Sequence, residues 1–168
     1  MQPVRARSGQ STGLRRTAAS QAGVGLIEVL VAVLVLSIGF VGIAALQARS
    51  LSTNNSALAR SMATVASYSI LDAMRADLTN AVGGAYNQTV KANACPSASG
   101  SLANAQLNQW CSVDLAQLGV SGSTSGSITC TAAPGTTTAY CTVTVQFDDS
   151  RAGLASSTTQ QVVTQAML

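Results

Sequence analysis

The sequence predicts an α+β fold in which one long N-terminal helix packs on a small antiparallel β-sheet. Residues 24–82 contain no proline and are rich in Ala and Leu, which favours a continuous helix. Residues 126–168 instead hold short runs rich in Thr and Val, and such runs are typical of strands. The helix pattern therefore comes first along the chain and the strand pattern last.

Charge is unevenly distributed along the chain. The 168 residues carry nine basic and six acidic side chains, no histidine, and a charged share of only 9%. Four arginines precede residue 24, giving +4, whereas five basic against six acidic side chains give −1 from there onward. When basic residues precede an apolar segment, the basic part of the chain typically stays on the cytoplasmic side of the membrane. We therefore expect the basic residues to set membrane topology, and we expect no nucleic-acid partner.

Residues 1–23 predict a cleaved leader peptide rather than a folded element, because they are polar and short of periodic apolar residues. Their basic side chains are Arg5, Arg7, Arg15 and Arg16. An ordinary secretory signal is cleaved after its apolar region, whereas here the small residue Gly23 precedes the apolar region. We therefore expect the apolar region to be retained.

Residues 24–48 predict a membrane-spanning helix. From Val29 to Ala48 there are 20 residues without a charge, and about 20 helical residues cross the roughly 30 Å hydrocarbon core of a bilayer. Inside a bilayer the backbone must satisfy its own hydrogen bonds, which favours a helix in spite of the many valines. Gly39 and Gly42 are small positions at which a neighbouring helix can approach closely.

We expect the same helix to continue through residues 49–82 and to end at Gly83-Gly84, because neither proline nor glycine interrupts this segment. Its apolar residues form two stripes about half a turn apart. The first stripe is expected to face neighbouring helices and the second to face the sheet. The first consists of Leu51, Leu58, Met62 and Val65, and the second of Leu71, Met74, Leu78 and Val82.

Residues 83–168 predict a globular domain made of a loop and a sheet. The loop, residues 83–125, is rich in Gly, Asn and Ser, with a short helix expected at 102–110 and a further turn at 114–118. Three strands are expected at 127–130, 139–147 and 159–168. Turn residues separate them at Pro134-Gly135 and at 149–153, which predicts an antiparallel meander.

The four cysteines all lie downstream of the membrane segment, in the part that would be exported. An even number in an oxidising compartment predicts two disulfides. Without a C-x-x-C pair or a histidine, the sequence predicts no metal site. The simplest pairs join neighbours along the chain, Cys95–Cys111 in the loop and Cys130–Cys141 across the predicted turn. Four cysteines allow three pairings, so the connectivity stays open.

Nothing in the sequence points to catalysis. Without histidine there is no Ser/His/Asp or Cys/His set, and the adjacent pair Asp148-Asp149 lies in a predicted turn. We expect Trp110, Tyr86 and Tyr140 to pack in the core or in loops rather than to form a binding surface. The chain is therefore expected to be no enzyme and to use no cofactor and no small-molecule substrate.

The junction between leader and helix resembles a known processing site. It reads AGVGLIEVLVAVLVLSIGFVGIAALQ, with Gly23, four further residues and then Glu28 at the head of the apolar run. This resembles the prepilin processing site of type IV pilins and of type II secretion pseudopilins. Together with the later SMATVASYSILDAMRADLTNA, it resembles in particular the type IV pilus modification proteins (PilV), a branch of the minor pilins. The resemblance covers residues 23 to about 80.

The resemblance implies a site and a fold. A membrane prepilin peptidase would cut between Gly23 and Val24 and N-methylate the Val24 amine. Glu28 would then be the fifth residue of the mature chain. A carboxylate inside a membrane segment needs a partner, and the new amine, its own or that of a neighbouring subunit, could provide one and set the axial register. The implied fold is a ladle, with the membrane half of the helix exposed and the second half on the sheet.

The implied function is structural: a minor pilin of a tip or priming complex that promotes type IV pilus assembly. Its expected partners are the bacterial inner membrane, the prepilin peptidase, other minor pilins and the major pilin. We expect a single-pass protein with a cytoplasmic N-terminus and a periplasmic C-terminal domain, which later reaches the pilus and the cell surface. The alternatives are a minor pseudopilin of a type II secretion system and, less favoured by the charge balance, a DNA-receptor or adhesive pilin.

Overall fold

The computed structural model describes residues 23–150 and 159–168, which form two compact units. One unit ends at Gly42 and the other runs from Ile43 to Leu168. Helix α1 (Leu26–Ala76) runs through both units: its residues up to Gly42 belong to the first unit and those from Ile43 onward to the second. Apart from Gly23, the predicted leader lies outside the described residues, as do residues 151–153 of the last predicted turn.

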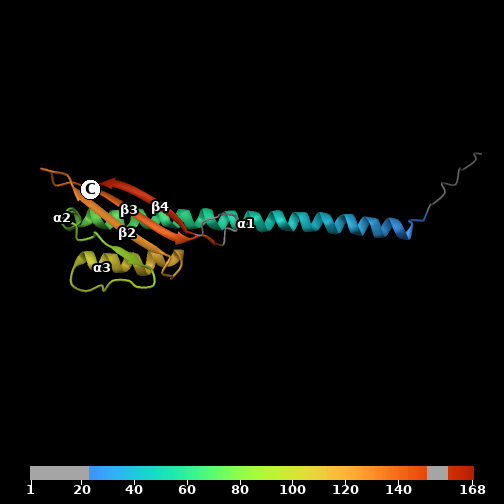
Figure 1. The fold of residues 1–168 in the computed structure, drawn as a ribbon, viewed down its shortest axis with the longest axis horizontal. Coiled ribbons are helices and arrows are strands. Elements are labelled where there is room, and N and C mark those ends of the chain that lie inside the picture. Colours follow the sequence, from blue (N-terminus) through green and yellow to red (C-terminus); the bar gives the residue numbers. More distant parts are fainter. Residues whose placement is uncertain (1–22, 151–158) are drawn as a thin grey trace, which may run out of the picture. The chain divides into compact units, whose positions relative to one another are not determined.

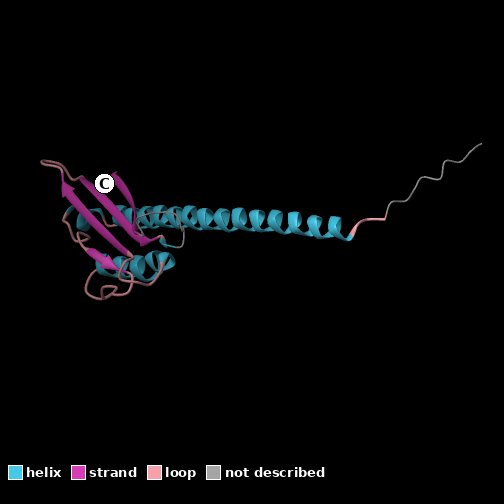
Figure 2. Cartoon of the chain, turned by 45° about the vertical axis from the view of Figure 1, so that its right-hand side comes forward, coloured by secondary structure: helices cyan, strands magenta, loops and turns pink. Residues whose placement is uncertain are grey.

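Four antiparallel strands form one sheet in the second unit, with the order β1-β2-β3-β4 (Figures 1 and 2). The predicted α+β fold, with a long N-terminal helix and an antiparallel sheet, is confirmed. The prediction of three strands is wrong by one: β1 is only three residues long and lies in a segment predicted as loop. The strands are β1 (Thr89–Lys91), β2 (Ser125–Ala132), β3 (Ala139–Asp148) and β4 (Thr159–Met167).

One face of the sheet forms the core of this unit. Alternate residues of β3 are buried while those between them are not, as expected where successive side chains point to opposite faces. The same alternation runs through β2, where Gly126, Ile128 and Cys130 are buried. β3 pairs with β2 and β4 along its length, with Cys141 opposite Cys130 on one side and Ala166 on the other.

The buried face of α1 differs in part from the predicted stripe. Leu71 and Met74 are fully buried as expected, whereas Leu78 is 39% exposed, so its assignment to the buried stripe is wrong. Small residues earlier in the helix take its place, because a helix can lie close to a sheet only where its side chains are short. The buried residues of α1 are Ala63, Ala66, Ser67, Ile70, Leu71 and Met74.

The helix predicted to run to residue 82 is interrupted. α1 ends at Ala76, Asp77 leaves the helical region with φ −123° and ψ 49°, and a short helix α2 (Leu78–Val82) follows. The Asp77 carboxylate accepts hydrogen bonds from Asn80 Nδ2 (2.8 Å) and from the Tyr86 hydroxyl (2.9 Å). These contacts come from residues later in the chain, so helix periodicity could not reveal them. The break turns Leu78 out of the buried face.

The predicted stop after residue 82 agrees with the structure. Gly84 has φ +79°, a left-handed conformation that glycine adopts without strain. The Gly84 N–H donates to the Ala81 carbonyl (3.1 Å) and the Ala85 N–H to the Asn80 carbonyl (2.9 Å). This double closure is a Schellman motif, which satisfies carbonyls at a helix C-terminus.

A second helical layer follows the loop. α3 (Leu102–Gln109) is capped at its N-terminus by Ser101, whose hydroxyl accepts a hydrogen bond from the Asn104 N–H (3.1 Å). It continues as a π-helical turn η1 (Trp110–Asp114) and a 3₁₀ turn η2 (Leu115–Leu118). The predicted helix at 102–110 and the predicted turn at 114–118 are therefore one nearly continuous helical segment.

Tyr86 gives this unit a pH-dependent stability. Its side chain is fully buried, and burial, together with the hydrogen bond and the negative charge of Asp77, raises the pKa of the phenol well above its ordinary value of 10. The unfolded chain therefore releases this proton at a lower pH than the folded one. The resulting stabilisation is present below about pH 10 and is lost as the pH rises further.

We expect the free energy of unfolding to fall more steeply above about pH 10 in the wild type than in Tyr86→Phe, by up to about 1.4 kcal/mol per pH unit. The matched control is Tyr140→Phe, because Tyr140 is an exposed tyrosine of the same unit. The measurement is urea unfolding at a series of alkaline pH values. If Tyr86→Phe follows the wild-type pH profile, the buried phenol is not the source of the dependence.

Candidate processing and assembly site

The predicted cleavage point lies in an accessible segment. Gly23, Val24 and Gly25 adopt no regular secondary structure, and α1 begins at Leu26. Val24 is 72% exposed, and a Cβ placed on Gly23 would meet no atom within 4 Å. The Gly23–Val24 peptide bond is therefore unobstructed by the described residues, as a bond offered to a peptidase must be.

Glu28 lies in the first turn of α1. Its backbone N–H donates to the Gly25 carbonyl at 2.9 Å, and the same carbonyl accepts from the Val29 N–H at 3.3 Å. A negative side chain in the first helical turn interacts favourably with the helix dipole. The side chain itself is exposed, and the only ion pair among the described residues joins Arg75 to Asp72. Glu28 is thus held at the helix start and is available to a cation.

The helix surface after Glu28 is apolar and exposed. Every residue from Gly23 to Leu51 is exposed, and Glu28 is the only charged one before Arg49. By length and composition, α1 contains a segment able to cross a membrane. An uncharged apolar surface of this length is far larger than the patches that soluble proteins usually expose, which is compatible with a membrane-spanning segment.

The first predicted stripe continues this exposed surface in the second unit. Leu51, Leu58 and Val65 are each more than half exposed, while Met62 is half-buried. Gln117 and Leu118 of the helical layer lie beside Met62, so this side of α1 is open at Leu51, Leu58 and Val65 and partly covered at Met62. That the stripe faces neighbouring helices stays a prediction.

Two disulfides brace the second unit. Cys95 is joined to Cys111 with a Cα–Cα distance of 5.6 Å, and Cys130 to Cys141 with 4.0 Å. These are the neighbouring pairs favoured by the sequence, and no described cysteine is free. Cys130–Cys141 links facing residues of β2 and β3. Disulfides form and persist mainly in oxidising compartments.

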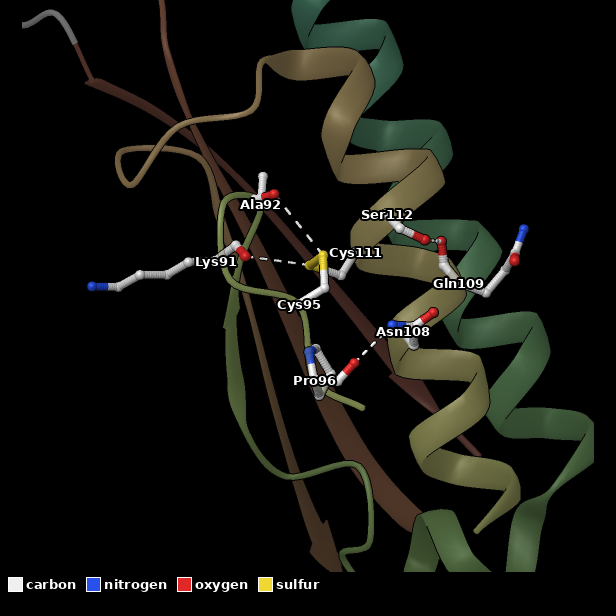
Figure 3. The surroundings of a disulfide bond; sticks show 8 residues. All are labelled: Lys91, Ala92, Cys95, Pro96, Asn108, Gln109, Cys111 and Ser112. Carbon is white, nitrogen blue, oxygen red and sulfur yellow. Dashed lines mark hydrogen bonds between the residues drawn. A yellow bond between two sulfur atoms is a disulfide. The ribbon is translucent and has the colours of Figure 1, made fainter. Parts of the chain in front are cut away.

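Figure 3 shows how Cys95–Cys111 fastens the loop after β1 to the helical layer. The sulfur atom of Cys111 lies 3.3 Å from the Lys91 carbonyl oxygen. Nearby, Asn108 Nδ2 donates a hydrogen bond of 2.7 Å to the Pro96 carbonyl (Figure 3). The loop after β1 is therefore fastened to the helical layer at two neighbouring points. These are the disulfide, whose cysteines are 16 residues apart in the sequence, and the Asn108–Pro96 hydrogen bond.

Two of the three aromatic residues considered above are core residues. Trp110 and Tyr86 are buried, whereas Tyr140 is 64% exposed on the outer face of β3. The Tyr86 hydroxyl hydrogen-bonds to both Asp77 and Gln106. The expectation of core packing is therefore confirmed for Trp110 and Tyr86 and wrong for Tyr140.

The acidic pair after β3 forms a local contact. Asp149 Oδ2 accepts a hydrogen bond of 2.5 Å from Ser56 Oγ on α1, and Asp148 Oδ1 accepts one from the Ser150 N–H. Within residues 23–150 and 159–168, no group of three or more His, Cys, Asp or Glu side chains could hold a metal ion. The pair therefore fastens the end of the strand.

Comparison with known proteins adds no assignment. No family model, no curated protein and no solved structure matches the chain.

Proposed function

We propose that this chain is a minor pilin, a structural subunit that promotes assembly of a type IV pilus from a tip or priming complex, as the resemblance to the PilV branch implies. The observation that carries the proposal is the exposed apolar start of α1, with Glu28 in its first turn directly after an accessible glycine. A helix of this kind is stable only in a bilayer or among similar helices. The pilin ladle combines it with a disulfide-bonded antiparallel domain.

Membrane topology follows from charge and from the disulfides. The arginines of the leader, residues 1–23, support a cytoplasmic N-terminus, and the two disulfides support a C-terminal unit in the periplasm. In this proposal the protein waits in the inner membrane as a single-pass subunit. Its apolar helix then leaves the bilayer for the filament core, and the globular unit reaches the cell surface.

Processing would create the partner that Glu28 needs. Cleavage between Gly23 and Val24 by the prepilin peptidase leaves a positive amine four residues before Glu28, and the same peptidase would N-methylate it. In a filament, the Glu28 carboxylate of one subunit pairs with the Val24 amine of its neighbour. Because a buried carboxylate without a partner is costly, this pairing selects one axial register among those that apolar packing alone would permit.

The processing step can be tested by the mass and N-terminal sequence of the membrane-extracted protein. We expect the mature chain to begin at Val24. Gly23→Val should retain the leader, because a branched side chain would occupy the cleavage point. Gly25→Val is the matched control: it lies in the same segment without regular secondary structure, and an added Cβ meets only Ile27 Cγ2 at 3.8 Å. A mature chain beginning at Met1, or after Ala48, would contradict the proposal.

The assembly step is tested by Glu28→Gln, which keeps size and removes charge. We expect this variant to be cleaved at the normal position and to remain in the membrane, while surface pili fall about as far as in a strain lacking the protein. The measurement is the amount of pilin sheared from the cell surface. Normal piliation by Glu28→Gln would contradict the assigned role of Glu28, whereas normal piliation in the deletion strain would contradict the proposed function.

A minor pseudopilin of a type II secretion system is the second candidate, because the exposed helix and Glu28 fit it equally well. The two candidates differ in partners. A pseudopilin cross-links to other secretion pseudopilins and its loss abolishes protein secretion, whereas the proposed minor pilin cross-links to pilins and its loss reduces pili. Secretion and piliation measured in the same deletion strain therefore separate them.

A further inference from the structure

Strand β4 (Thr159–Met167) is an open edge of the sheet. It is the last strand in the order β1-β2-β3-β4, and within the described residues it pairs only with β3 (Figure 1). A strand at an edge presents a row of unpaired N–H and C=O groups that another chain can use.

The alternation of hydrogen bonds between β3 and β4 shows which backbone groups of β4 face outward. Ala139 and Leu168 exchange both backbone hydrogen bonds, each 2.9 Å long. Such pairs recur at every second residue of an antiparallel ladder, so the residues of β4 bonded to β3 are those of even number. The N–H and C=O groups of Gln161, Val163 and Gln165 therefore point away from the sheet. The described residues form no further strand beside them.

The opposite edge of the sheet is closed. β1 is three residues long, and its Lys91 is covered by a turn in which the Ala94 N–H donates to the Lys91 carbonyl at 2.8 Å. Beyond β1, the side chain of Asn87 occupies the edge of β2, accepting from the Cys130 N–H (2.7 Å) and donating to its carbonyl (2.9 Å). Strand addition at that edge is blocked.

β4 lacks the residue types that commonly protect edge strands from pairing with other chains. It contains no lysine, no other charged residue, no glycine and no proline, although charge and proline commonly prevent unwanted pairing. Its outer face also carries apolar side chains: Val163 is 56% exposed, and Met167 is 62% exposed beside Tyr140 on β3. A partner strand would bury these side chains as well as satisfying the backbone.

One cation lies at the end of this edge. Arg60 Nη2, on α1, donates a hydrogen bond of 3.0 Å to Gln160 Oε1. No acidic side chain lies within 4.0 Å of the Arg60 guanidinium, because Arg75–Asp72 is the only ion pair that the described residues form and every acidic residue of the chain is among them. Residues opposite each other in neighbouring strands share a face. A residue opposite Gln160 would therefore point toward the side on which Arg60 lies.

We propose that the outer edge of β4 is a docking site for an antiparallel strand of a different protein chain, whose carboxylate lies opposite Gln160 and pairs with Arg60. The strand would place apolar residues opposite Val163 and Met167. In the minor-pilin reading such a strand would belong to another subunit, but the docking site does not depend on that reading.

Charge argues against a second copy of this chain as the occupant. Its available edge would be β4 itself, which has no acidic side chain to offer Arg60, and its β1 edge is covered by the turn at Lys91–Ala94. A partner with its own acidic strand end fits the site better.

The test uses the full chain in detergent micelles and a capped peptide, Val-Ala-Thr-Thr-Val-Val-Thr-Glu, designed to pair with residues 167 to 160 in that order. Its twin ends in Lys. At a peptide concentration ten times the Kd, we expect hydrogen exchange of the Gln161, Val163 and Gln165 amides to slow about tenfold. The Glu peptide should bind about 3-fold tighter than the Lys twin.

Two variants separate the backbone part of the proposal from the charge part. Val163→Pro removes an outward N–H together with the exposed valine side chain, at a position where edge strands tolerate proline, and should lose peptide binding while the β3 amides stay protected. Arg60→Ala leaves the strand unchanged and should remove the difference between the twin peptides.

Several results would overturn the proposal. These are no slowing at the solubility limit of the peptide, equal slowing in a folded Val163→Pro variant, and equal affinity of the two peptides for the wild type. Concentration-dependent protection of the same amides without peptide would overturn it too, because it would identify a second copy as the occupant.

Discussion

Replacing Trp110 with alanine is expected to destabilise the globular unit by about 3–5 kcal/mol. The indole is 1% exposed, and its Nε1–H donates a hydrogen bond of 2.8 Å to the Ala66 carbonyl of α1. On its other side the ring lies on Gly126 of β2, whose backbone it approaches closely. Removing the ring would leave a large cavity between helix and sheet and lose a buried hydrogen bond.

The close approach to Gly126 makes the prediction specific. A Cβ on Gly126 would come within 2.1 Å of Trp110 Cη2, so Gly126→Ala should also destabilise, by about 1–3 kcal/mol or more. In the double variant Gly126→Ala/Trp110→Leu the clash is absent, and the two losses should not add. Gly122→Ala is the control, since its added Cβ would meet only Asn93 Nδ2 at 3.4 Å.

These free energies can be measured by urea unfolding of the full chain in mild detergent, followed by circular dichroism. Additive losses in the double variant would contradict direct packing of Trp110 on Gly126. A loss below about 1 kcal/mol for Trp110→Ala would contradict its place in the core.

Replacing Leu71 with alanine is the second large effect that we expect, a loss of about 2–5 kcal/mol. Leu71 is fully buried on the face of α1 that packs in the core. Leu51 lies on the same helix with the same side chain, but it is 65% exposed, so Leu51→Ala should change stability by at most about 0.5 kcal/mol.

The Leu71 and Leu51 pair also tests whether two faces of α1 have different roles. Leu51→Ala should instead weaken association with other helices, which can be followed as the amount of protein recovered in sheared filaments. Equal losses of stability at the two positions would contradict the division into a face toward the sheet and a face toward other molecules.

Several features of the fold could be read from local sequence, because local chemistry specifies them. The long helix follows from a segment without proline, the end of α2 from Gly84 at positive φ, and the long strands from alternating Thr- and Val-rich runs. The candidate site at Gly23, Val24 and Glu28 is also local, a motif of six consecutive residues. Its role as a processing and register site stays a prediction.

Other features depend on contacts between distant residues, so periodicity could not reveal them. β1 is too short to show a pattern and exists because β2 pairs with it. The buried face of α1 includes Ala63 and Ala66, whose small side chains carry little hydrophobic signal but permit close packing of Trp110. The helix break at Asp77 is held by Tyr86, nine residues further along the chain.

The sequence by itself thus determined an α+β protein with an exposed apolar helix, one glutamate at the head of that helix, and four cysteines beyond it. The reason is that hydrophobic length, charge position and helix period are properties of consecutive residues. Only the tertiary structure decided which side of α1 is covered, which edge of the sheet stays open, and that Arg60 lies beside Gln160 at that edge. These features depend on how segments far apart in the chain pair, and on which backbone hydrogen bonds the fold leaves unused.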